Sequence, residues 1–276
     1  MNDLVLGVVQ NYDWPQLRAY AVSLTRSGFS GTKLLFVNNI STPARLHLTQ
    51  LGFTLIDFFC DDRDGFIIRG RFKPVVEFLK EKYHVFRYII WTDVRDVVFQ
   101  TNPSTWLEEH LSPHKLLGAK ECWKIKDEGF NNRWARETAP EAYEGLREED
   151  ACCGGTLAGD AMWMTMILDK IYKIVSDNPQ ANDQGALNYL LRTPTFKEVT
   201  RVPRMEEGFA VMAAAFHTPT FNSYVDASIP LTDDAPLFDK ENGIILAPNS
   251  NIPFSIVHQY DRDKEWIPII EEKYFD

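Results

Sequence analysis

The amino-acid sequence predicts an α/β fold in which a mixed, mostly parallel sheet is flanked by helices. From the N-terminus to Gln100, short apolar runs alternate with longer amphipathic segments in four β-α repeats. Parallel strands require helical crossovers of this kind. The chain has 276 residues, of which 45% are hydrophobic, so it can bury a sizeable core. Because no internal repeat or linker divides it, we expect a single domain over residues 1–276.

Each predicted strand is a short apolar run, and each predicted helix carries apolar residues on one face. In the first helix, Leu17, Ala21 and Leu24 have the spacing of such a face. Pro43 suits the first turn of the second helix, where a missing N–H costs nothing. The predicted strands are Leu4–Val9, Lys33–Val37, Phe53–Phe58 and Phe86–Thr92, with helices at Trp14–Arg26, from Thr42 onward and at Arg71–Tyr83.

Beyond Gln100 the alternation is looser. Residues 125–149 are polar, as an exposed loop or helix should be, yet Phe130, Trp134 and Tyr143 give this segment something to bury. The predicted elements of this half are strands at Leu116–Lys120 and Phe254–Val257, an ordered segment at Ala151–Gly159, an apolar run at Gly243–Leu246, and helices at Asp160–Ser176 and Asp183–Leu191.

Charge and cysteine usage limit the partners and the compartment. A net charge of -10 provides no basic field and argues against nucleic acid as a partner. The first residues lack a positively charged region, and their apolar run is too short for a signal peptide or a membrane span. Four cysteines without paired metal spacing suit a reducing environment. We therefore expect a cytoplasmic protein without an integral membrane segment.

The most informative motif follows the strand that ends at Thr92. Asp93 and Asp96 stand where this apolar run stops, with Arg95 between them. Open α/β sheets bind ligands beyond the carboxyl ends of their strands. Mg²⁺ or Mn²⁺ can be coordinated there by carboxylate oxygens and by the phosphate oxygens of a ligand. Alternatively, Asp93 caps a turn and Asp96 pairs with Arg95 or a lysine. Because the apolar run Val97–Phe99 comes next, the acids interrupt a buried strand, where unpaired charge is costly.

The stretch from Thr92 to Gln100 resembles the Asp-x-Asp region of GT-A glycosyltransferases, closest to those whose motif reads hydrophobic-x-Asp-x-Arg-Asp-Val. The resemblance includes Arg71 and Phe72 at the start of the preceding helix. Three further places extend it over most of the chain: Gln10-Asn11-Tyr12 after the first strand, Cys153-Gly154-Gly155 ahead of a helix, and Asn182-Asp183-Gln184 with Leu187-Asn188.

This resemblance implies a GT-A fold and a divalent cation, Mn²⁺ or Mg²⁺, held by Asp93, Asp96 and His258. The motif has one residue more between its acids than the usual Asp-x-Asp. Which acid binds the ion directly therefore stays open, with Asp96 favoured. Neutral imidazole is a natural ligand for such ions, which suits His258 after its predicted strand.

The resemblance also implies contacts with a nucleotide-sugar donor. Gln10, Asn11 and Tyr12 would meet the base and ribose by stacking and hydrogen bonding, with helix capping as the competing role of Asn11. Gly154 and Gly155 would let the backbone approach the sugar or diphosphate, or would simply form a tight turn. The other implied donor contacts are Arg69, Arg71, Asp93, Arg95 and Gln184.

Asp183 is the candidate general base, which would remove a proton from the attacking hydroxyl if the reaction inverts the anomeric centre. The competing role is to cap the helix that follows. If configuration is retained, Asp183 and Gln184 would hold the donor sugar instead. Glu148, Glu149 and Asp150 are reserve candidates, although a run of acids is more often a solvated face.

The sequence thus predicts a metal-dependent glycosyltransferase that moves a sugar from a nucleoside-diphosphate sugar, with UDP expected, to a hydroxyl of a saccharide or glycan. Residues 1–100 would bind the nucleotide and residues 101–276 the acceptor. Aromatic faces for sugar rings are available at Trp106, Trp123, Trp134 and Trp163, although most should lie in the core.

Two other classes are considered. A sugar-1-phosphate nucleotidyltransferase normally has a Gly-rich, basic loop after its first strand, but the segment Val9–Trp14 contains neither Gly nor Lys. A non-catalytic carbohydrate-binding protein on the same fold is the second alternative.

Overall fold

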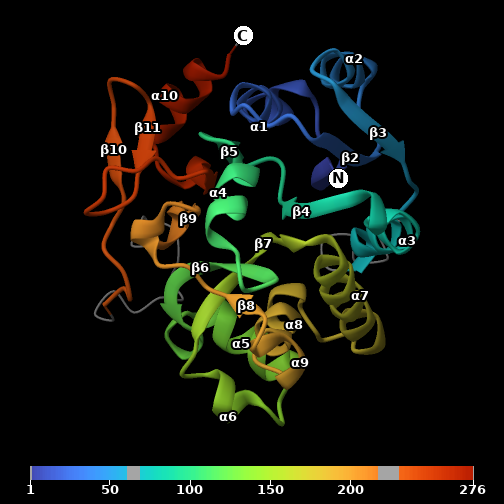
Figure 1. The fold of residues 1–276 in the computed structure, drawn as a ribbon, viewed down its shortest axis with the longest axis vertical. Helices are drawn as coiled ribbons and strands as arrows, with labels where there is room; N and C mark the ends of the chain where they lie inside the picture. The colour runs from blue at the N-terminus through green and yellow to red at the C-terminus, as the bar shows by residue number, and fades with distance from the viewer. Residues whose placement is uncertain (1, 61–68, 217–229, 276) are drawn as a thin grey trace.

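The computed structural model describes residues 2–60, 69–216 and 230–275, and a seven-stranded sheet with the order β3-β2-β1-β4-β7-β6-β8 forms its centre (Figure 1). β3, β2, β1 and β4 are parallel, β7 is antiparallel to both neighbours, and β8 is parallel to β6. The predicted mixed sheet is confirmed. The strands are β1 (Asn2–Gln10), β2 (Thr32–Asn38), β3 (Phe53–Asp57), β4 (Phe86–Thr92), β6 (Leu116–Lys124), β7 (Asp150–Asp160) and β8 (Thr200–Arg201).

Capping residues mark the starts of the first two helices. Asp13 caps the first helix and forms a capping box with Gln16, while Ser41 caps the second with Pro43 in its first turn. The third helix packs its apolar face, including Phe72, against the sheet. These helices are α1 (Trp14–Arg26), α2 (Thr42–Gln50) and α3 (Phe72–Lys82), as the sequence predicts.

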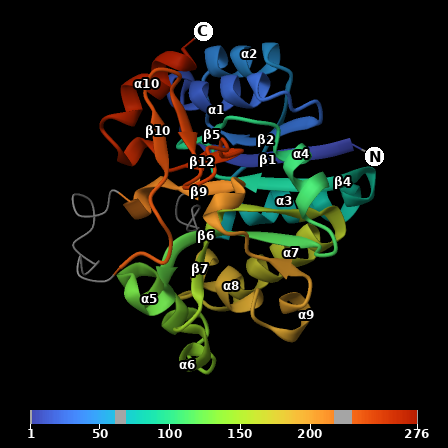
Figure 2. The same ribbon diagram turned by 60° about the vertical axis from the view of Figure 1, so that its left-hand side comes forward.

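Helices cover both faces of the sheet. α1 and α2 lie on one face, and α3 and α7 (Ala161–Asp177) lie on the other (Figures 1 and 2). Alternate residues of β1 serve the two layers: Val5 and Val9 belong to the core under α1, whereas Leu4 and Leu6 belong to the core over α3. A central strand of a parallel sheet is expected to be buried on both sides in this way.

A second, three-stranded sheet with the order β5-β12-β9 begins where β4 ends. The turn Asp93–Asp96 joins β4 to β5, and Val97 of β5 lies opposite His258 of β12. The expectation that the two acids interrupt one buried strand is therefore wrong, because they lie between strands of different sheets. The three strands are β5 (Val97–Phe99), β9 (Ala210–Met212) and β12 (Ile256–His258).

The polar segment of residues 125–149 contains two helices, at the opposite end of the molecule from α1 and α2 (Figures 1 and 2). Glu128 caps α5 by accepting the backbone N–H groups of Phe130 and Asn131, and Tyr143 at the start of α6 is buried. The remaining helices and strands are α4 (Pro103–His110), α5 (Gly129–Thr138), α6 (Tyr143–Leu146), α8 (Asp183–Leu190), α9 (Pro194–Lys197), α10 (Trp266–Lys273), β10 (Leu237–Asp239) and β11 (Ile244–Leu246).

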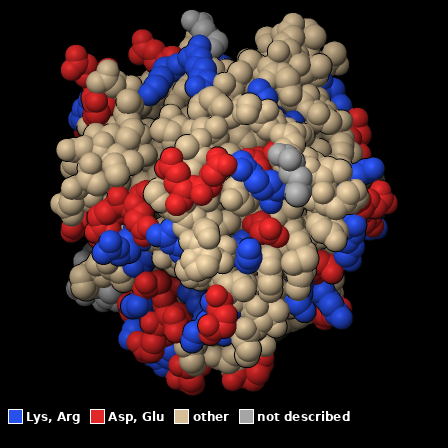
Figure 3. All heavy atoms as spheres, viewed as in Figure 1, with Lys and Arg blue, Asp and Glu red and all other residues tan. Residues whose placement is uncertain are grey.

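The surface and the cysteines follow simple patterns. Acidic and basic side chains are interspersed over the face shown in Figure 3. All four cysteines are buried as free thiols, as expected. Within the described ranges, no helix combines the length and apolar character that crossing a membrane requires.

Candidate active site

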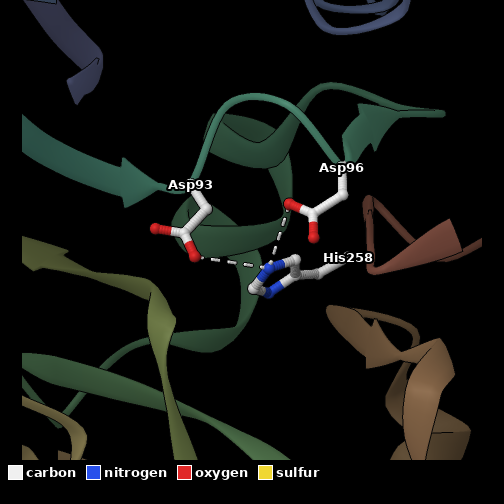
Figure 4. A group of neighbouring side chains, drawn as sticks. All are labelled: Asp93, Asp96 and His258. Carbon is white, nitrogen blue, oxygen red and sulfur yellow. Dashed lines mark ion pairs between the residues drawn. The ribbon is translucent and has the colours of Figure 1, made fainter. Parts of the chain in front are cut away.

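The turn after β4 brings Asp93 and Asp96 to His258, the last residue of β12 (Figure 4). His258 Nε2 lies 3.6 Å from Asp93 Oδ2 and 3.5 Å from Asp96 Oδ1. One ligand atom from each of the three residues lies within 4.8 Å of the others. Two carboxylates and an imidazole at this spacing form a donor set that suits Mn²⁺ or Mg²⁺. We call these three side chains the Asp-Asp-His group.

Backbone hydrogen bonds hold both ends of the turn. The Asp93 N–H donates to the carbonyl of Gly155 at 2.8 Å, and the Gln259 N–H donates to the carbonyl of Asp96 at 2.7 Å. Gln259 has a left-handed backbone conformation with φ of 60°. Because such a conformation costs a non-glycine residue about 1 kcal/mol, the surrounding contacts must impose it directly after His258.

Thr156 and Cys153 on β7 contact the Nδ1 side of the His258 ring. The Thr156 hydroxyl donates to the carbonyl of Gly155 at 2.8 Å and lies 3.3 Å from His258 Nδ1. Cys153 Sγ lies 3.4 Å from the same nitrogen. Nε2 points between Asp93 and Asp96, which is the usual arrangement of a metal-binding histidine whose other nitrogen is hydrogen bonded.

Neighbouring cations keep the Asp96 carboxylate ionised. Burial alone would raise the pKa of Asp96, but His258, Arg95 and Arg262 lower it to about 2. Burial would likewise lower the pKa of His258, yet Cys153 and Asp96 raise it well above 6.5. A cation bound by Nε2 would take the place of a proton there, so the charge balance of the group suits either occupant.

Arg71 connects the Asp-Asp-His group to the start of α8. Its buried guanidinium donates to Asp93 Oδ1 at 2.6 Å and forms an ion pair with Asp183. It also lies 5.4 Å from the ring centroid of Trp91 on β4. Burial raises the pKa of Asp183, although Arg71 opposes this shift. The Arg71 guanidinium therefore links Asp183, the predicted base, to Asp93, a predicted metal ligand.

Asn182, not Asp183, caps α8. The Asn182 side chain accepts the N–H groups of Gln184 and Gly185. The capping role considered for Asp183 is thus filled by its neighbour. Asp183 is the first residue of the helix: its Oδ1 also accepts the N–H of Gln184 at 2.9 Å, and its Oδ2 pairs with Arg71.

Gly154 and Gly155 lie inside β7, so the tight turn considered from the sequence is wrong. A Cβ at position 155 would come within 2.4 Å of Asp93 Oδ2 and 2.5 Å of His258 Cε1. Glycine is therefore required where β7 passes the Asp-Asp-His group. The N–H of Gly154 donates to Gln184 Oε1 at 2.9 Å and orients that side chain.

Gln10 is the last residue of β1, and Asn11 and Tyr12 follow it at the same edge of the sheet. Asn11 adopts a left-handed conformation with φ of 59°, and its side-chain oxygen accepts from Asn39 at 2.6 Å. Tyr12 is half-buried beside Arg95, and burial raises its pKa. Arg95 in turn pairs with Asp96 at 3.3 Å. Of the residues predicted to bind the base and ribose, Tyr12 therefore adjoins the Asp-Asp-His group through Arg95.

The other predicted residues lie elsewhere. Arg69 lines a separate hollow with Lys73 and Tyr172, and the structure does not bring it to the Asp-Asp-His group. Among the reserve base candidates, Glu148 and Glu149 are exposed, as the alternative of a solvated face predicts, and Glu148 pairs with Lys126. Asp150 is partly buried at the start of β7, where it pairs with Lys120 and Lys124.

A small pocket of about 160 Å³ lies beside the charged residues. Gln184 and Gln259 belong to its wall, and they directly follow Asp183 and His258 in the chain. The wall also contains Glu121, Trp123, Glu128, Phe130, Asn131 and Trp134. We call this the Glu121 pocket.

The sequence did not single out Glu121. The strand predicted to end at Lys120 continues to Lys124, but its pairing with β7 shifts register after Lys120, and Cys122 has a left-handed φ of 61°. Simple alternation would not have placed Glu121 in a pocket. Of the four tryptophans considered for sugar rings, two line the pocket, whereas Trp106 and Trp163 pack against Phe209 and Phe196.

Comparison with known proteins identifies the fold. No protein-family model and no curated protein matches the chain. The structure is similar to that of the galactosyltransferase LgtC in complex with donor and acceptor sugar analogs, with a TM-score of 0.58, 16% identity, and coverage of 98% of this chain and 95% of that one. An apo structure of the bifunctional glycosyltransferase WbbM has a TM-score of 0.57, 12% identity, and coverage of 99% and 51%. These likenesses confirm the predicted GT-A fold.

Mn²⁺ should raise the melting temperature of the protein through the Asp-Asp-His group. A ligand at a hundred times its Kd stabilises the folded state that binds it by about 2.7 kcal/mol. Asp96→Asn and His258→Ala should each remove most of the rise, because the first removes the negative charge of a ligand and the second removes the imidazole. The matched control is Asp169→Asn, an ion-paired but 41% exposed carboxylate on α7. Differential scanning fluorimetry measures the shift, and equal shifts in all variants would place the ion elsewhere.

Gly155→Ala should destabilise the protein and weaken Mn²⁺ binding, since the added methyl group overlaps Asp93 and His258. Over-packing of this kind typically costs about 1–3 kcal/mol. Urea denaturation measures the loss. Gly145→Ala is the control, because nothing lies within 4 Å of a Cβ at that position. If both variants were as stable as the parent, β7 would be able to accommodate a side chain at position 155, contrary to this prediction.

Proposed function

We propose that the protein is a metal-dependent glycosyltransferase that moves a sugar from a nucleoside-diphosphate sugar, with UDP the expected nucleotide, to a hydroxyl of a saccharide or glycan. The Asp-Asp-His group at the carboxyl end of the parallel strands carries this proposal. Open α/β sheets bind their ligands at that edge. The similarity to LgtC, whose structure holds donor and acceptor sugar analogs, supports a site of the same layout.

The donor diphosphate would lie at the Asp-Asp-His group. A divalent cation there, Mn²⁺ or Mg²⁺, would act as a Lewis acid on the diphosphate as the sugar leaves. Tyr12 and Asn11 would bind the base and ribose at the end of β1. Arg95, 37% exposed and adjacent to both Tyr12 and Asp96, would add positive charge beside the leaving group. This assigns nucleotide binding to residues 1–100 and leaves the acceptor to residues 101–276.

Asp183 is proposed as the general base toward the acceptor hydroxyl. Its raised pKa favours proton uptake, and Gln184 beside it belongs to the wall of the Glu121 pocket, where an acceptor would enter. Arg71 would hold the carboxylate in place and stabilise its charged form before transfer. If the reaction retains configuration, the same pair would bind the donor sugar instead.

The two alternatives make different demands. A nucleotidyltransferase would need a basic, Gly-rich loop after β1, and residues 10–13 are Gln, Asn, Tyr and Asp. A carbohydrate-binding protein without turnover would retain the pocket but would not need a metal group next to it. The geometry of a cation site directly beside a pocket therefore favours the transferase.

The test is slow hydrolysis of nucleotide sugars in the presence of Mn²⁺. A panel of UDP- and GDP-linked sugars is incubated with the protein, and released nucleoside diphosphate is quantified by chromatography. Release from at least one donor, abolished by EDTA and by Asp96→Asn, is the expected result. Pyrophosphate-dependent exchange would indicate the nucleotidyltransferase, and silence with every donor would indicate the binding protein.

Asp183→Asn should slow transfer much more than it weakens donor binding. Loss of a general base lowers the rate by roughly 10²–10⁴-fold. Measuring kcat and the donor KM separately checks this, with Asp169→Asn as the exposed control for the same chemical change. An unaltered kcat would exclude Asp183 as the base. Circular dichroism must accompany the assay, because the variant also leaves Arg71 with one carboxylate fewer.

A further inference from the structure

Glu121 is held so that one of its carboxylate oxygens stays available. Glu121 Oε2 accepts hydrogen bonds from Asn131 Nδ2 at 2.8 Å and Gln184 Nε2 at 3.0 Å. Within the described ranges, no side chain or backbone group donates to Oε1. Because Glu121 lines the pocket, this oxygen is free to accept a hydrogen bond from a ligand there.

The amide network around Glu121 has one consistent orientation. Gln184 Oε1 accepts from the Gly154 N–H at 2.9 Å, so Gln184 Nε2 must donate, and it does so to Glu121 and to Asn131 Oδ1 at 2.8 Å. Asn131 Nδ2 then donates to the carboxylates. Every amide group in the network is thus committed, which fixes the Glu121 side chain.

Two acidic side chains, Glu121 and Glu128, lie on the described wall of the Glu121 pocket. They accept from the same Asn131 Nδ2, at 2.8 and 2.9 Å. Burial raises the pKa of Glu121, and the neighbouring His258 lowers it. None of the described residues that line the pocket is Lys or Arg. Arg133 of α5 lies 5.6 Å from the centroid of the Phe130 ring and 3.9 Å from Glu137. A ligand with its own negative charge would meet repulsion here.

Aromatic rings form the apolar part of the same wall. Phe130 and Trp134 on α5 lie with ring centroids 5.4 Å apart, and Trp123 stands on β6 beside Glu121. A pyranose ring presents apolar C–H groups on its faces and hydroxyls at its edge. Aromatic rings next to a hydrogen-bonding carboxylate match both parts of such a ligand.

We propose that the Glu121 pocket binds the acceptor as a glycoside that carries no anionic group, and that Glu121 is the residue that selects for this class. The inference rests on the proposed function, whose acceptor it defines. Glu121 Oε1 accepts a hydrogen bond from an acceptor hydroxyl, or from the ammonium group of an amino sugar. A carboxylate, phosphate or sulfate on the acceptor is disfavoured by Glu121 and Glu128.

Saturation-transfer NMR with matched glycosides tests the inference. The probes are the methyl glycosides of glucose and galactose, their 2-amino-2-deoxy forms and their uronic acids, each titrated at pH 7 in the presence of Mg²⁺, which is diamagnetic, and UDP. We expect the neutral and amino glycosides of at least one series to bind about tenfold more tightly than the uronic acid. Equal binding of the uronic acids, or no binding of any probe, would overturn the inference.

Two variants assign the selection to Glu121. Glu121→Gln keeps the shape and removes the charge, so the preference against the uronic acid should largely disappear. Trp134→Ala should weaken every probe to a similar extent without changing the preference. Glu144→Gln, whose side chain is 80% exposed, is the matched control and should change neither. An unchanged preference in Glu121→Gln would remove Glu121 from the proposal.

The donor assay keeps the two proposals separable. Hydrolysis of a nucleotide sugar by the parent protein requires no acceptor. Hydrolysis without discrimination among the glycosides would contradict only the acceptor inference. Discrimination without hydrolysis of any donor would contradict the proposed transferase and leave a glycoside-binding pocket of the stated selectivity.

Discussion

The balance of buried charge at the end of β4 is the constraint on which the rest of this site depends. Carboxylates withdrawn from water cost several kcal/mol each unless cations and hydrogen bonds compensate them. Here Arg71 forms ion pairs with Asp93 and Asp183, while His258 and Arg262 form ion pairs with Asp96. These partners come from the residue before α3, the end of β12 and the segment after it, so the charges can be balanced only when both sheets are in place.

The backbone around this charge balance is shaped by the same need. Because position 155 is glycine, β7 can pass close to Asp93 and His258. Gln259, directly after His258, has a left-handed backbone conformation. Thr156, next to Gly155, orients the imidazole. β7 therefore contributes space and orientation to the site but no charged ligand of its own, which explains why its sequence looks unremarkable beside the Asp93–Asp96 motif.

Two chemically different environments meet at Gln184. On one side lie charged residues that suit a cation and an anionic diphosphate, and on the other lies a pocket of aromatic rings, amides and two carboxylates. Gln184 bonds to Gly154 of β7 and to Glu121 of the pocket, so it forms part of the boundary. An anionic donor and an uncharged acceptor would be sorted to opposite sides of this boundary by electrostatics alone.

The sequence by itself determined the layers of the fold, since apolar runs and one-sided helices such as α1 and α3 are local patterns. It also predicted a shared role for Asp93, Asp96 and His258. Only the tertiary structure decided that the acids lie between two sheets, that Asn182 rather than Asp183 caps α8, and that Glu121 faces a pocket. The reason is physical: periodicity reports burial along one element, whereas the partner of a buried charge and the wall of a pocket come from segments far apart in the chain. The irregular register of β6 after Lys120 removed even the local pattern at Glu121.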